Sequence, residues 1–262
     1  MTYKSLYEFI ELTKKNQIYK GNLGQILTEI ISILRKKSKT KQDYSVLAFQ
    51  SPRIIRALID YKNNNPNNKK LLKLSRDGTN LALKIYKQYD NPKMKDEVLK
   101  FKKKISQLGN AKILKTEIQQ YHDLINLIVS NPKLSQKSAE KLNKLVGLEK
   151  VIFLVIGHGA INVGMDVFLR YQELNGKKNV LFYPVRFSRT EFKKYKDQVP
   201  QLTPSEIKYL QKQAIGRKII VFDENSYTGK TIKEVVKYFS QNVFCRHKIN
   251  VLYNMNTKNL KV

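Results

Sequence analysis

Two adjacent carboxylates follow an apolar run in the last third of the chain. Residues 219–222 read Ile-Ile-Val-Phe, which is typical of a buried strand, and Asp223 and Glu224 come directly after them. A polar loop, residues 225–231, then leads into apolar residues at helical spacing. Carboxylates in this position can hold a ribose diol or a hydrated Mg²⁺. The loop amides, at the start of a helix, favour an anion such as a phosphate.

The spacing of this stretch distinguishes two phosphate-binding motifs. A Walker A loop requires a glycine five residues before Gly229, and that position is Glu224, so the pattern fails. Residues 219–231 instead resemble the PRPP-binding motif of type I phosphoribosyltransferases, which has an apolar strand, two acidic residues, a few variable residues and then Thr-Gly followed by a threonine or serine. The resemblance extends more loosely over residues 150–255. The plainer alternative is a strand–loop–helix turn capped by Thr228.

The resemblance implies a set of roles for named residues. It implies that Asp223 and Glu224 engage the ribose hydroxyls of PRPP, directly or around Mg²⁺. It implies that the following loop binds PRPP and cradles its 5′-phosphate. The residues of that loop are Tyr227, Thr228, Gly229, Lys230 and Thr231.

Two earlier segments extend the resemblance. Gly157, His158 and Gly159 follow the apolar run 151–156, and the family has a short loop there that contacts pyrophosphate; a plain tight turn also explains the glycines. Residues 187–212 are polar and charged, where the family has a mobile lid that often begins with a basic residue. Arg186 and Arg189 are the matching residues, and a surface excursion is the alternative.

Tyr227 departs from part of the family. Purine-salvage members with a similar Thr-Gly-Lys-Thr ending carry an aspartate just before it, near N7 of the base. A phenol, with an ordinary pKa near 10, is a poor proton acceptor at neutral pH. The departure argues against purine salvage by that route.

Apolar runs near residues 151, 180, 219 and 249 alternate with helical patterns, which predicts an α/β fold with a parallel sheet over residues 149–262. Residues 1–148 are predicted to be all-helical and to act as a hood over the base, a partner-binding surface or an oligomerisation element such as a homodimer contact. The expected helices include one that closes near Gly21, one that begins at Ser51-Pro52, and a long one over residues 113–129.

The composition adds limits on class and partners. The chain has 262 residues and a formal net charge of +29, with 31 basic and 13 acidic residues in 1–150 and 19 and 8 in 151–262. This charge favours a nucleic-acid partner, although AT-rich coding also enriches lysine. One cysteine, Cys245, excludes an internal disulfide, and three scattered histidines argue against structural zinc.

No apolar run reaches the ~18 residues of a membrane span, and the first residues lack a signal-peptide core, so we expect a cytoplasmic protein that does not bind membranes.

Two functional hypotheses follow. The first is a Mg²⁺-dependent phosphoribosyltransferase that transfers phosphoribosyl from PRPP to a base or another acceptor. The second is a non-catalytic module that binds PRPP or a nucleotide and engages nucleic acid or a protein through its basic surface. The acidic pair and the Thr-Gly-Lys-Thr sequence favour the first, whereas Tyr227 and the charge favour the second.

Overall fold

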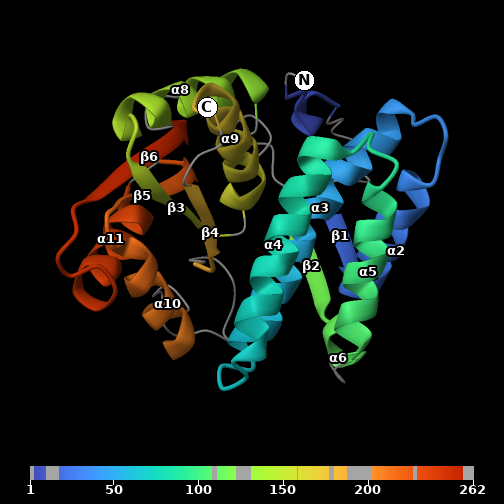
Figure 1. The fold of residues 1–262 in the computed structure, drawn as a ribbon, viewed down its shortest axis with the longest axis horizontal. Coiled ribbons are helices and arrows are strands. Elements are labelled where there is room, and N and C mark those ends of the chain that lie inside the picture. The colour runs from blue at the N-terminus through green and yellow to red at the C-terminus, as the bar shows by residue number, and fades with distance from the viewer. Residues whose placement is uncertain are drawn as a thin grey trace. The chain divides into compact units, whose positions relative to one another are not determined.

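The computed structural model describes residues 3–9, 18–107, 111–121, 131–157, 159–176, 180–187, 202–226 and 229–255. The chain divides into two compact units, Met1–Leu127 and Ile128–Val262, and each is described here by itself (Figure 1). Within the described ranges, none of the helices combines the length and the apolar character needed to cross a membrane.

The first unit contains helices and one two-stranded sheet. Its elements are η1 (Leu6–Phe9), β1 (Ile18–Asn22), α2 (Leu23–Leu34), α3 (Lys41–Asn63), α4 (Lys70–Gln88), α5 (Met94–Gln107), α6 (Ala111–Leu114) and β2 (Glu117–Tyr121).

The prediction that this region is all-helical is therefore wrong. Strands β1 and β2 pair antiparallel, with Ile18 opposite Tyr121 and Asn22 opposite Glu117, where helices had been expected to close near Gly21 and to run over residues 113–129. The amide of Leu23 also donates to the carbonyl oxygen of Thr116 at 3.2 Å. The pairing partner lies far away in sequence, so local periodicity could not reveal it. Residues 122–130 lie outside the described ranges.

Helix α3 runs through Pro52, where the sequence had predicted the start of a helix. Proline has no amide hydrogen, so the carbonyl of Ala48 one turn earlier loses its helical donor. The hydroxyl of the fully buried Tyr86, on α4, donates to that carbonyl oxygen at 2.7 Å. Helix α3 begins instead at a capping box formed by Thr40 and Asp43. A tertiary hydrogen bond thus replaces the one that Pro52 removes.

The second unit is an α/β domain. Its elements are α8 (Pro132–Val146), β3 (Lys150–Ile156), α9 (Ala160–Leu174), β4 (Val180–Val185), α10 (Pro204–Ala214), β5 (Arg217–Asn225), α11 (Lys230–Asn242) and β6 (Ile249–Met255). The four strands form a parallel sheet in the order β4-β3-β5-β6. The predicted α/β fold with a parallel sheet is confirmed for these residues.

Alternation along β3 divides its side chains between two buried faces. Ile152, Leu154 and Ile156 belong to a cluster that includes Leu210 of α10 and Phe239 of α11. On the other face, Phe153 packs against Phe182 and Phe222, with ring centroids 6.3 and 5.2 Å apart, and α9 contacts β3 and β5. Helices α8 and α9 therefore cover one face and α10 and α11 the other (Figure 1).

Helix α8 belongs to the sheet-containing unit. It packs along α9, and its buried Ser138 donates a hydrogen bond of 2.8 Å to the side-chain oxygen of Asn254 on β6. The sequence had grouped this helix with those before residue 148, because its amphipathic pattern resembles theirs. The structure places the division at residue 128.

Candidate functional site

The order of the strands places a topological switch point between β3 and β5, where open parallel sheets have a crevice outside the carboxyl ends of their strands. The chain leaves β3 through α9 to reach β4 on one side, and then returns past β3 to form β5 on the other side. Helices α9 and α11, which follow β3 and β5, lie on opposite faces of the sheet. Such a reversal is where open parallel sheets bind ligands, at the carboxyl ends of the strands. The glycine loop and the acidic pair both lie at that edge.

The glycine loop after β3 turns sharply against the end of β4. Gly157 has a positive φ of 78°, and a β-carbon there would lie 2.8 Å from the carbonyl oxygen of Phe187. Its amide donates to the carbonyl oxygen of Val185 at 2.9 Å. Gly159 then precedes the first residue of α9, and no side chain caps that helix. The loop therefore needs glycine at position 157, for both steric and conformational reasons.

Glu224 and Gly159 come together across the crevice. A β-carbon on Gly159 would overlap the carboxylate of Glu224, so only a glycine lets the carboxylate approach this closely. The contact joins the loop after β3 to the acidic pair at the end of β5, where Val155 of β3 pairs with Phe222 of β5. Residues that are 65 positions apart by their numbers thus form one site.

The carboxyl groups of Asp223 and Glu224 are hydrogen-bonded to each other. Burial raises the pKa of Asp223 from 3.8 to about 6, and hydrogen bonds from the Glu224 carboxyl group and from the amides of Glu224 and Asn225 offset only part of that rise. Two adjacent carboxyl groups in a crevice repel each other when both are ionised. A divalent cation or the hydroxyl groups of a diol would relieve this repulsion. Perturbed acids of this kind are typical of functional sites.

Two hydroxyl groups stand beside the loop after β5. Tyr253 of β6 lies opposite Asp223 in the sheet, and its hydroxyl is hydrogen-bonded to the Ser226 hydroxyl. The Ser226 and Tyr253 oxygens lie 3.8 and 3.9 Å from where a β-carbon on Gly229 would be. Burial, and next the charge of Asp223, raise the pKa of Tyr253, which keeps its hydroxyl protonated.

Gly229 precedes α11 in the left-handed conformation, with φ of 67°, and no side chain caps this helix. Lys230 and Thr231 are the first residues of α11, and Lys230 is exposed. The predicted Gly-Lys-Thr segment therefore does lie at a helix start beside the acidic pair. Sequence reasoning missed Tyr253, because only the order of the strands brings β6 next to Asp223.

Arg186 directly follows β4 and is buried, with 7% of its surface exposed. Since Val185 pairs with Ile156, Arg186 lies next to the strand that carries the glycine loop. His158, Arg189, Tyr227 and Thr228 lie outside the described residues, so their predicted roles stay predictions. Among the residues that the structure does describe, no three histidine, cysteine, aspartate or glutamate side chains are grouped to hold a metal.

Comparisons with protein-family models, with curated proteins and with solved structures find no match. The functional argument therefore depends on the geometry of this crevice and on the residues around it.

Proposed function

We propose that the second unit binds PRPP and transfers its phosphoribosyl group to a base or another acceptor, in the manner of type I phosphoribosyltransferases. The contact between Glu224 and Gly159 carries the proposal. It supports a single pocket in which a phosphate-binding turn and a ribose-binding acidic pair face the same ligand. An ordinary strand–loop–helix turn has no need for a second glycine turn packed against its acidic residues.

The residues present are suited to Mg²⁺ that arrives with a phosphorylated ligand. Asp223 and Glu224 supply two carboxyl groups, and there is no larger cluster of metal-binding side chains in the described ranges. Mg²⁺ often binds through one or two carboxylates, and substrate phosphates and water complete its shell. When bound, the ion would neutralise charge on the departing pyrophosphate.

The chain's own residues orient the sugar and stabilise charge. Asp223 and Glu224 would accept hydrogen bonds from the 2- and 3-hydroxyls of the ribose ring. The start of α11, with Gly229 and Lys230, would bind the 5′-phosphate, and the start of α9 would face pyrophosphate. Arg186 would add positive charge as the bond at the anomeric carbon breaks. The protein therefore acts through positioning and electrostatics, and no covalent intermediate is required.

The alternative function is a non-catalytic module that binds PRPP or a nucleotide and engages nucleic acid or a protein partner. Two observations favour it: Tyr227 stands where purine-salvage relatives carry an acid, and the net charge is +29.

Thermal unfolding with Mg²⁺ and PRPP tests both functions. A ligand at one hundred times its Kd stabilises the folded state by about 2.7 kcal/mol, which raises Tm measurably. We expect a rise for the wild type and none for the double variant Asp223→Asn/Glu224→Gln. Asp96→Asn is the matched control, because Asp96 is an exposed residue of α5, and this variant should respond like the wild type.

Pyrophosphate release then separates the two functions. Release across a panel of bases supports the transferase. A rise in Tm without release supports the module, and salt-dependent binding to RNA or DNA supports it further. A wild type that shows no rise in Tm with Mg²⁺ and PRPP contradicts both.

A further inference from the structure

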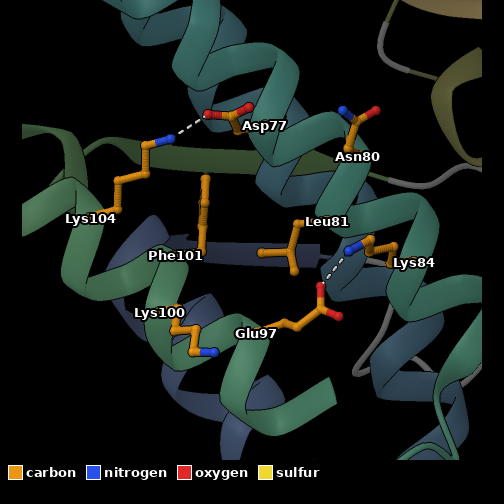
Figure 2. A pocket seen from close by; sticks show the side chains of 8 residues that line it. All are labelled: Asp77, Asn80, Leu81, Lys84, Glu97, Lys100, Phe101 and Lys104. Atoms are coloured by element: carbon orange, nitrogen blue, oxygen red, sulfur yellow. Dashed lines mark hydrogen bonds and ion pairs between the residues drawn. The ribbon is translucent and has the colours of Figure 1, made fainter. Parts of the chain in front are cut away.

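A pocket of about 350 Å³ lies between α4 and α5 in the first unit (Figure 2). Its lining comes from one face of each helix. The lining residues are Asp77, Asn80, Leu81 and Lys84 of α4, and Glu97, Lys100, Phe101 and Lys104 of α5. Pockets that bind small molecules are commonly of this size or larger.

Two ion pairs bridge the helices. Lys84 Nζ lies 2.7 Å from Glu97 Oε2, and Lys104 Nζ lies 2.6 Å from Asp77 Oδ2. Figure 2 shows Leu81 and Phe101 between these pairs. Each acid of the lining is thus neutralised by a lysine of the opposite helix, and neither acid repels an anion as it would alone.

The centre of the pocket has a different character. Leu81 and Phe101 are nearly buried and form a small apolar floor. Gly78 makes room for Leu58 and for the ring, because a β-carbon there would overlap Leu58 Cδ1 and would lie 3.2 Å from Phe101 Cζ. Asn80 and Lys100 are exposed, and within the described part of the chain no hydrogen bond or ion pair engages either side chain.

We propose that this pocket binds a small organic monocarboxylate with a flat apolar body. Three lysines face two acids, and since Lys84 and Lys104 are engaged, Lys100 is the one cation left over. A carboxylate carries one negative charge, which the ammonium group of Lys100 balances. A phosphate dianion carries two negative charges, one more than this lysine can balance. The Asn80 amide can donate a second hydrogen bond to the carboxylate. The floor of Leu81 and Phe101 suits an apolar body about the size of one ring.

This site is independent of the PRPP proposal, because it belongs to the other unit. Titration of the full-length protein with 4-fluorobenzoate, followed by ¹⁹F NMR, tests it. We expect saturable binding to the wild type. Lys100→Gln should weaken it roughly tenfold, as expected for loss of a hydrogen bond between charged groups. Lys103→Gln is the matched control, because Lys103 is exposed on the same helix but does not line the pocket, and it should bind like the wild type.

Two further ligands test whether the pocket requires both a negative charge and an apolar body. The neutral 4-fluorobenzamide should bind at least several-fold more weakly than 4-fluorobenzoate, and inorganic phosphate should not displace the carboxylate. Equal binding of the amide would show that the pocket does not require a negative charge on its ligand. Displacement by phosphate would show that it does not require an apolar body. Absence of saturation at millimolar 4-fluorobenzoate, or an unchanged affinity in Lys100→Gln, would overturn the site itself.

Discussion

A β-carbon on Gly159 would overlap the carboxylate of Glu224, although Gly159 follows β3 and Glu224 lies near the end of β5. Gly159 immediately precedes α9, so this contact joins the loop after β3 to the carboxyl end of β5. The first prediction concerns this contact.

Gly159→Ala should disturb the acidic pair. The new methyl group forces the Glu224 carboxylate to move, and we expect a loss in free energy of unfolding of about 1 kcal/mol, because the displaced group is the end of a flexible side chain. Urea unfolding measures this loss. In a Glu224→Ala background the same change should cost almost nothing, so the two substitutions should be non-additive. Additive effects would show that the methyl group meets something else.

Asp223→Asn should stabilise the free protein at neutral pH. The folded-state pKa of Asp223 is raised from 3.8 to about 6, so the protonated acid favours folding, and this contribution is lost as pH rises from about 4 through 6. Ionised Asp223 therefore costs on the order of 3 kcal/mol above pH 6. Urea unfolding at pH 5 and pH 7.5 should show a gain for Asp223→Asn that grows with pH. Asp96→Asn serves as control, and an equal pH trend there would contradict the assignment to Asp223.

Tyr253→Phe should weaken binding of PRPP, if the proposed function holds, by loosening the loop before α11. The variant loses the hydroxyl that is hydrogen-bonded to Ser226 beside Gly229. We expect a Kd for PRPP with Mg²⁺ that rises about fivefold, equivalent to about 1 kcal/mol. Isothermal titration calorimetry gives the Kd. Tyr238→Phe, farther along α11, is the control, and equal losses in both variants would point to a general effect of the lost hydroxyl.

Tyr86→Phe should destabilise the first unit. It leaves the Ala48 carbonyl, which Pro52 already deprives of its helical donor, without the Tyr86 hydroxyl. An unsatisfied buried carbonyl costs about 1–3 kcal/mol, measured by urea unfolding. In a Pro52→Ala background the helical amide returns, so Tyr86→Phe should cost less. The same cost in both backgrounds would contradict the link between Tyr86 and Pro52.

Several features could be predicted from local sequence because they depend on neighbours along the chain. The apolar run before Asp223 indicated β5, and the spacing after Gly229 indicated α11, since burial of one element leaves its own periodicity. The start of α10 is likewise a local feature, because Thr203 and Glu206 form a capping box there. The α/β character of the second unit followed from the alternation of such segments.

The tertiary structure decided which strands and side chains lie next to each other. The sequence could not indicate that β1 pairs with β2, that α3 continues through Pro52, or that Tyr253 stands opposite Asp223, because each depends on a partner distant in sequence. Parallel strands in particular meet only after the chain has crossed the sheet, and their order is set by packing over both faces. The sequence alone predicted which residues could bind a phosphorylated sugar. Only the strand order β4-β3-β5-β6 brought Gly159 and Glu224 to the same crevice.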